Sequence, residues 1–262
     1  MRHNITNTFP MEMKDMLSSS SSRSVSDVVV AWYNEPGVER WVSALAFAFS
    51  ERPAGERYRI FVFHKGSTAE DAKQRLFDVL GTKCSDVDVF FEHLDNVGRE
   101  ADTWLHYTVA RLRAGDMPVN RVAFLQGDPW DHFGTPHGGR ERNLDVFSSK
   151  LVALLAPTAH PMASNPEPLF CNLMSESRVM RRGLSHPQRL DLERVWVEAF
   201  GCECKVDSYV FAAGAQYLVD AMRLSQEKPL SWWTSLHHKL RADEINAWEI
   251  ERFWLHIFGD GV

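Results

Sequence analysis

The sequence lacks several features that mark specialised classes of protein. Four cysteines in 262 residues are few and irregularly spaced, which argues against a disulfide framework and favours reduced thiols in a cytoplasmic compartment. A formal net charge of −6 leaves no basic surface, so we expect no nucleic-acid partner. No apolar run approaches the roughly 18 residues that a membrane span needs, and we expect no such span.

The amino-terminal segment also lacks the apolar core of a signal peptide. Its serine run has nothing to bury, so residues 1–26 are predicted to form a disordered tail. The remaining residues, 27–262, have enough apolar side chains for a large core, since 44% of the chain is apolar and it contains nine Trp. We therefore expect one folded domain after the tail.

What the sequence does contain is a repeating pattern of strands and helices. Four β-branched or aromatic runs follow one another at intervals of about thirty residues, the length of a βαβ unit. These runs are DVVVAWY (27–33), YRIFVFH (58–64), VDVFFEHL (87–94) and RVAFLQG (121–127). Near-continuous apolar strands that alternate with helices predict an α/β fold with a mainly parallel sheet flanked by helices.

Two of the intervening helices have clear apolar faces. The first places Val38, Trp41, Val42, Leu45, Ala46 and Phe49 on one side, and the second does the same with Ala101, Trp104, Leu105, Val109 and Leu112. We expect Asn34 to cap the first helix. Gly115 is expected to end the second helix.

Polar residues follow the fourth predicted strand directly. Asp128, Asp131 and His132 come just after its carboxyl end, where ligands bind in parallel sheets. Hard oxygen ligands from such a loop suit Mg²⁺ or Mn²⁺. The alternative is that Asp128 caps the following turn and that His132 is ordinary polar surface.

Several blocks of the sequence resemble an uncharacterised, glycosyltransferase-like family with many fungal members. The blocks are VVVAWYNE, DNVGREADTWLHY, FLQGD with DHF, AAGAQYLV and EIERFWLHIFG. The resemblance implies a GT-A nucleotide-sugar transferase core. In that fold the first strand ends in the nucleotide pocket, and the fourth ends in a D-x-D motif that holds a divalent metal on the donor diphosphate. Here Gln126 stands where the first aspartate of that motif is usual.

The predicted ligand contacts lie at the carboxyl ends of the first four strands and in the loop before the second helix. For a UDP- or GDP-linked donor they are Ala31, Tyr33, Asn34, His64, Lys65, Asn96, Gly98, Arg99, Gln126 and Gly127. The metal ligands implied by the resemblance are Asp128 first, then Asp131 and His132, with His256 as a late histidine brought to the metal. Structurally, Asp95 or Asn96 has the alternative role of a helix cap.

A base for the transfer is expected near the carboxyl terminus. The segment INAWEIERFWLHIFG is predicted to form one helix that buries Ile245, Trp248, Phe253 and Ile257. Glu249 and Glu251 are two residues apart and so lie on different faces. Glu251 is our candidate for the carboxylate that takes the acceptor's proton, with an ion pair to Arg252 as the alternative.

The segment 134–205 carries no part of the resemblance and is expected to be an insertion on the acceptor side, with helices near its two ends. The resemblance, together with the acids after the fourth strand, implies a metal-dependent glycosyltransferase that acts on a glycan or small-molecule acceptor. A catalytically inactive nucleotide-sugar or glycan binding module is the alternative, because of Gln126. A phosphate-ester hydrolase ranks last, since the chain shows no clear nucleophile loop.

Overall fold

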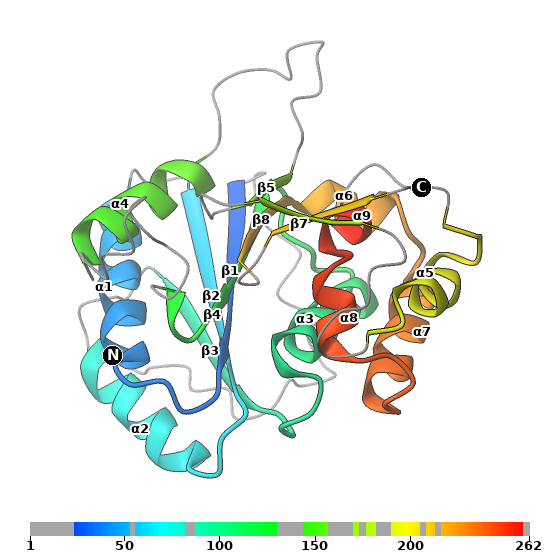
Figure 1. Cartoon of the computed structure of the whole chain (residues 1–262). Helices are drawn as coiled ribbons and strands as arrows, with labels where there is room; N and C mark the ends of the chain where they lie inside the picture. The colour runs from blue at the N-terminus through cyan, green and yellow to red at the C-terminus, as the bar shows by residue number, and fades with distance from the viewer. Residues whose placement is uncertain are drawn as a thin grey trace.

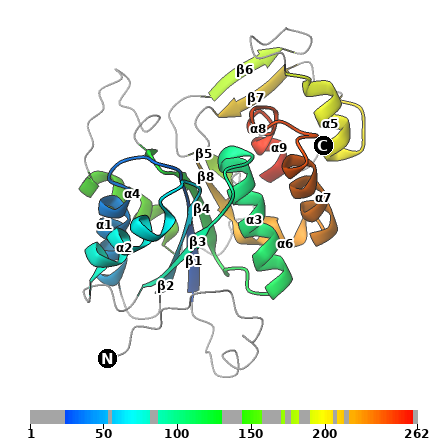
Figure 2. The same ribbon diagram turned by 90° about the horizontal axis from the view of Figure 1, so that it is seen from below.

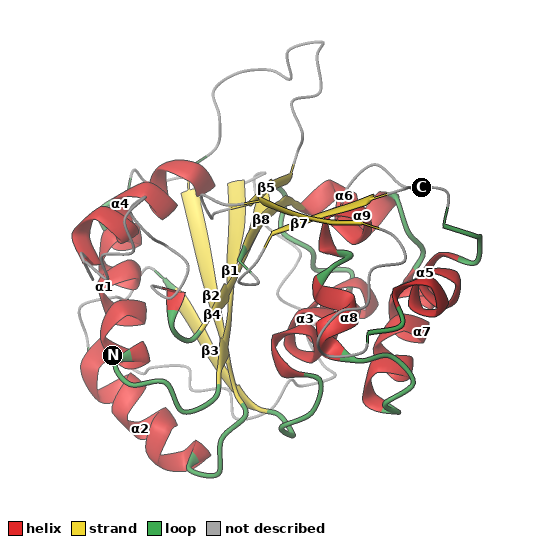
Figure 3. Ribbon diagram, in the orientation of Figure 1, coloured by secondary structure: helices red, strands yellow, loops and turns green. Residues whose placement is uncertain are grey.

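The computed structural model describes residues 24–52, 56–81, 87–129, 144–156, 170–172, 177–181, 190–204, 208–212 and 216–258. Its strands form one six-stranded sheet and one two-stranded sheet (Figures 1 and 3). The strands are β1 (Ser24–Trp32), β2 (Glu56–His64), β3 (Asp88–His93), β4 (Arg121–Gln126), β5 (Phe170–Asn172), β6 (Ser177–Arg181), β7 (Ser208–Ala212) and β8 (Tyr217–Asp220). The helices are α1 (Val38–Ser50), α2 (Ala69–Leu80), α3 (Arg99–Ala114), α4 (Leu144–Leu155), α5 (Leu192–Phe200), α6 (Ala221–Gln226), α7 (Leu230–Arg241), α8 (Ala247–Glu251) and α9 (Trp254–Phe258).

The large sheet has the strand order β3-β2-β1-β4-β8-β5. Strands β1 to β4 are parallel, whereas β8 runs antiparallel to β4 and β5 antiparallel to β8. The predicted α/β fold with a mainly parallel sheet is confirmed. One boundary is wrong, because β1 begins at Ser24 and pairs there with Glu56, so residues 24–26 belong to the sheet and not to the tail.

Helices cover both faces of the sheet (Figures 1 and 2). Alternate residues of β1 point to opposite faces, so Val28 and Val30 pack with α1, α2 and α4, while Val29 packs with α3 and the carboxyl-terminal helices. Part of the segment 134–205 therefore belongs to this core, since Phe147 and Leu151 of α4 are buried against the first face. Strand β5 of the same segment lies at the edge of the large sheet.

The apolar faces of the helices are confirmed, but their predicted caps are wrong. All six residues predicted to face inward on α1 are buried. The cap of α1 is Gly37 (φ 81°) rather than Asn34, and the cap of α3 is Gly98 (φ 59°) rather than Asp95 or Asn96. Both loops turn through the left-handed region immediately before the helix, which glycine adopts without strain. Gly115 ends α3 as predicted.

The carboxyl-terminal segment forms two short helices rather than the single predicted helix. Helix α8 ends at Glu251 and α9 begins at Trp254, with a turn at Arg252 and Phe253. The predicted strand over 208–219 is likewise divided, because β7 pairs with β6 while β8 pairs with β4. None of the helices within the described ranges is long and apolar enough to cross a membrane.

A buried polar network closes the amino end of the parallel strands. Arg59 on β2 donates to both carboxylate oxygens of Asp27 at 2.7 Å and to both oxygens of Asp116 at 2.8 Å. Tyr107 on α3 donates to Asp27, and Arg111 donates to Asp116 at 2.7 Å. These bonds join β1, β2, α3 and the chain that enters β4.

Candidate functional site

The carboxyl ends of β1 and β4 lie side by side where the strand order reverses. From β1 the chain proceeds to β2 and β3 on one side, and then returns to place β4 on the other side of β1. Ala31, buried at the end of β1, is the register partner of Gln126 at the end of β4. In open α/β sheets, ligands bind in the crevice outside the carboxyl ends of the strands at such a reversal, so the edge formed by the ends of β1 and β4 is the candidate site and is here named the crevice.

Glu35, which was not among the residues predicted from the sequence, lies at this reversal. Its Oε2 accepts a hydrogen bond from the Tyr33 amide at 2.8 Å, and a Cβ added to Gly127 would overlap the same oxygen. The Glu35 carboxylate thus lies against the backbone of Gly127. The carbonyl oxygen of Gly127 also accepts a hydrogen bond from Trp41 Nε1 at 3.1 Å, which fixes the position of this backbone. Burial raises the pKa of Glu35, and the nearby charge of Glu100 raises it further.

The end of β4 folds back on itself beside Glu35. Gln126 Nε2 donates to the backbone oxygen of Asp128 at 2.8 Å, and Asp128 is partly buried. Asp131 and His132 lie outside the described residues. Gln216, the residue before β8, supports this turn, because its Nε2 donates to the carbonyl oxygen of Pro129 at 2.9 Å. Gln126 therefore has a local structural role, and Asp128 is the acid that follows it at the crevice.

Lys65 is buried on the α3 face of the sheet, where it contacts protein groups on every side. Its Nζ donates to the backbone oxygen of Val97, to that of Arg99 at 2.7 Å and to Asp102 at 3.1 Å. Burial lowers the pKa of Lys65, although Asp102 opposes the shift. Lys65 thus fastens the loop before α3 to the end of β2.

Asp102 is the centre of that arrangement. It is fully buried and also accepts hydrogen bonds from His237 Nε2 at 2.9 Å and from Arg241 Nη1 at 3.2 Å, both on α7. Burial opposes ionisation of Asp102, but the hydrogen bonds from His237 and Lys65 outweigh it and lower the pKa. The four side chains hold α3, α7 and β2 together.

The loop before α3 presents Arg99 to solvent. Gly98 and Arg99 both have positive φ, at 59° and 50°, and a Cβ on Gly98 would meet Leu240 at 2.9 Å. The Arg99 guanidinium lies 3.9 Å from the centre of the Trp248 ring, and its Nε donates to Glu100 at 3.3 Å. Arg99 is half exposed and is held by this stacking, while Asn96 is exposed.

Glu251 is the last residue of α8 and is partly buried. Burial raises the pKa of Glu251, while Arg252, whose Nη1 is 3.0 Å from Oε1, lowers it and Glu100 raises it. Glu100 therefore acts electrostatically on both Glu35 and Glu251. Glu249, in contrast, closes the capping box of α8 and accepts the Asp191 amide at 2.9 Å.

His256 lies in an aromatic cluster between α9 and α5. Its ring packs edge-on against Trp196, with 4.9 Å between ring centres, and burial lowers its pKa. No group of three or more His, Cys, Asp or Glu side chains within the described ranges is arranged to hold a metal ion. The hard oxygen donors that the crevice does offer are the carboxylates of Asp128 and Glu35.

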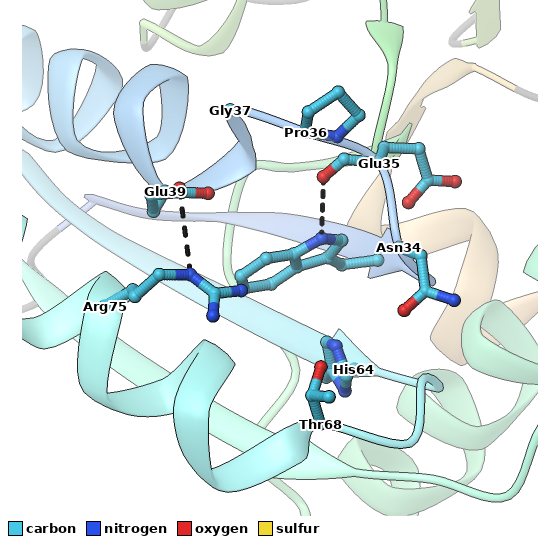
Figure 4. Close-up of a pocket in the computed structure, with 9 residues that line it drawn as sticks. Asn34, Glu35, Pro36, Gly37, Glu39, His64, Thr68 and Arg75 are labelled. Atoms are coloured by element: carbon cyan, nitrogen blue, oxygen red, sulfur yellow. Dashed lines mark hydrogen bonds and ion pairs between the residues drawn. The ribbon is translucent and has the colours of Figure 1, made fainter.

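A pocket of about 330 Å³ opens on the other side of the β1 end, toward α1 and α2 (Figure 4). Its lining residues are Trp32, Asn34, Glu35, Pro36, Gly37, Glu39, His64, Thr68 and Arg75. Of the predicted donor contacts it includes Asn34 and His64, whereas Lys65 lies on the opposite face of the sheet. Successive residues of a strand point to opposite faces, which separates His64 from Lys65.

Comparison with known proteins adds no relative. No protein-family model matches the sequence, and no curated protein matches it. The resemblance to glycosyltransferase-like proteins therefore stays a prediction.

Proposed function

We propose that this protein transfers a sugar from a UDP- or GDP-linked donor, with the donor diphosphate in the crevice between the ends of β1 and β4. The observation that carries this proposal is the placement of Glu35, Gly127 and Asp128 at the reversal of strand order. Diphosphates bind at such reversals in open α/β sheets. The acceptor is a glycan or a small hydroxylated molecule.

Release of a nucleoside diphosphate leaves negative charge on the departing oxygen. A bound Mg²⁺ or Mn²⁺ would neutralise that charge without a proton transfer. Asp128 would hold the ion, and the carboxylate of Glu35 is a second hard oxygen donor at the same edge. Two protein carboxylates are sufficient for Mg²⁺, because the remaining positions are filled by water and by diphosphate oxygens.

Glu251 is the proposed base toward the acceptor. A carboxylate accepts protons more readily when its pKa moves toward the working pH, and burial moves the pKa of Glu251 in that direction. The Arg252 guanidinium at 3.0 Å orients the carboxylate. In this arrangement α8 supplies the base, while the loops after β1 and β4 hold the donor.

The direct test is the thermal stability of the purified chain with UDP or GDP, with and without Mn²⁺. A ligand that binds the folded state raises the melting temperature, so a metal-dependent rise is expected for one of the two nucleotides. Asp71→Asn, which changes an exposed acid on α2, is the matched control for Asp128→Asn. A rise that survives Asp128→Asn unchanged would contradict the assignment of Asp128 to the metal.

A binding module without turnover is the second candidate, favoured by Gln126 at the usual position of an aspartate. Such a module would bind the nucleotide sugar in the same crevice without catalysing its transfer. The two candidates separate in one experiment, in which the nucleotide sugar that stabilises the chain is incubated with Mn²⁺ and free nucleotide is measured. Binding without release of nucleotide, across a panel of acceptors, identifies the module.

A further inference from the structure

The pocket beside α1 and α2 has its own chemistry, distinct from that of the crevice. It is lined from the loop after β1, which contributes Asn34 and Glu35, and from the loop and helix after β2, which contribute Thr68 and Arg75 (Figure 4). Glu35 borders both the pocket and the crevice. A ring bound in the pocket would therefore lie beside the proposed position of the donor diphosphate without occupying it.

His64 supplies a buried hydrogen-bond donor to this pocket. Only 1% of the residue is exposed, and its Nδ1 accepts the Gly66 amide at 3.2 Å. Burial lowers the pKa of His64, with His93 and Arg75 adding to the effect, so the ring is neutral at neutral pH. A neutral imidazole that accepts at Nδ1 carries its proton on Nε2. Within the described part of the chain, no group accepts a hydrogen bond from this Nε2–H.

The charges around the pocket do not favour an anion. The guanidinium of Arg75 is already 3.9 Å from the carboxylate of Glu39, while Glu35, the second acid of the lining, points its carboxylate away from Arg75 (Figure 4). A phosphate accepts hydrogen bonds and cannot donate to a carboxylate unless it is protonated. Acidic residues also occupy the first turns of both adjoining helices, which offsets the attraction of helix amino termini for anions.

The hydrogen-bonding groups instead alternate between donors and acceptors. The Nε2–H of His64 and the Arg75 guanidinium donate, the Glu39 carboxylate accepts, and the Asn34 amide can do both. The Thr68 hydroxyl makes no capping bond to α2 and can also do both. The buried ring of Trp32, oriented edge-on to His64 at 5.0 Å, adds an apolar surface. A sugar ring matches this set, because its hydroxyls donate and accept while its C–H groups pack on apolar surface.

We propose that the pocket lined by Asn34, His64 and Glu39 binds a neutral, hydroxyl-rich ring, either the ribose of a nucleotide or a pyranose of a glycan. This inference goes beyond the transferase proposal and does not require turnover. Glu39 is the residue that distinguishes it from a phosphate site. A carboxylate strengthens binding of a hydroxyl donor and weakens binding of an anion.

The test uses saturation-transfer NMR on the full chain with D-glucose, uridine and inorganic phosphate as separate probes. We expect glucose or uridine to bind, and Glu39→Gln to weaken that binding about tenfold, the scale of one hydrogen bond to a charged group. Glu70→Gln, which changes an exposed acid on α2 outside the pocket, is the control and should leave binding unchanged. His64→Phe should abolish binding. If the His64→Phe variant does not fold, the Glu39→Gln variant alone decides the test.

Competition identifies the source of the ring. If UDP displaces the sugar probe, the ring is the ribose of a nucleotide, whereas simultaneous binding of UDP and glucose indicates a glycan. The proposal is overturned if neither glucose nor uridine binds. It is also overturned if phosphate binds and Glu39→Gln strengthens the binding of phosphate. Sugar binding without any metal-dependent nucleotide binding would reject the transferase proposal and leave this one standing.

Discussion

At the amino end of the parallel strands, buried charges are paired with one another, whereas at the carboxyl end of β2 the buried side chain of His64 lines a pocket. Arg59 satisfies Asp27 and Asp116 through short hydrogen bonds, and Tyr107 completes the set around Asp27. At the other end, His64 is equally buried but lines a pocket with one ring nitrogen available. The first network therefore joins elements of the fold, while the second edge is where we propose that a ligand binds.

The largest effect is expected from breaking the amino-end network. Arg59→Met leaves the fully buried Asp27 without its charged partner and should lower the free energy of unfolding by about 3–5 kcal/mol. Urea denaturation at neutral pH measures this loss. Arg57→Met, which removes an exposed pair with Asp88, is the control and should change stability by less than about 1 kcal/mol. Similar losses in the two variants would show that the network is not a stabilising element.

At the carboxyl end, Asp128→Asn should have the opposite profile, with a large effect on function and a small one on folding. Removing one electrostatic contact to the departing diphosphate should slow transfer about a hundredfold or more, the scale of a single oxyanion-hole donor. The free energy of unfolding should change by no more than about 0.5 kcal/mol, as is usual for loop acids. If Asp128 is instead a turn cap, stability falls and metal-dependent nucleotide binding persists.

Lys65 belongs to the carboxyl end but resembles the amino-end network, because it was predicted to contact the donor and instead lies among buried protein partners. Lys65→Met removes three hydrogen bonds, while Asp102 keeps those from His237 and Arg241. We expect a loss of about 2 kcal/mol in the free energy of unfolding, the scale of a hydrogen bond to a charged group. Sugar binding in the pocket should be unaffected, and a selective loss of nucleotide binding with stability intact would restore Lys65 to the donor site.

The positions of some helices and strands can be predicted from the local pattern of apolar residues. The inward face of α1 and the four parallel strands were predictable, because apolar periodicity determines which residues are buried. The opposite orientations of His64 and Lys65 also follow from the two-residue period of a strand. Both residues were nevertheless predicted to contact the same donor. The glycine caps were not evident, since they depend on φ values that the loops adopt in the fold.

Glu35 could not be selected from the sequence for a different reason. Its carboxylate is defined by contact with Gly127, which follows another strand, so its burial depends on the pairing of β1 with β4. The break between α8 and α9 likewise depends on tertiary packing, because Phe253 and Trp254 are both buried in one aromatic core. A continuous apolar pattern carries no information on such a turn.

The smallest effect is expected from Glu35→Gln, and its sign depends on pH. Because the folded pKa of Glu35 is raised above its ordinary value of 4.5, ionisation disfavours the folded state. Its contribution to stability is fully present below pH 4.5 and is lost as pH rises through the raised pKa. Glu35→Gln should therefore be more stable than the parent at neutral pH, by about 0.5–1 kcal/mol, and the advantage should disappear in acid.

Asp102→Asn is the matched contrast for that measurement. The folded pKa of Asp102 is lowered below its ordinary value of 3.8, so its stabilising contribution is present above that pH and is lost as pH falls through the lowered value. Asp102→Asn should thus destabilise the protein at neutral pH, where Glu35→Gln stabilises it. Urea denaturation of both variants between pH 3 and pH 8 compares the two signs directly. A destabilised Glu35→Gln at neutral pH would mean that its charge holds the loop after β1 in place, and Glu35 would then belong with the structural acids rather than with the ligand site.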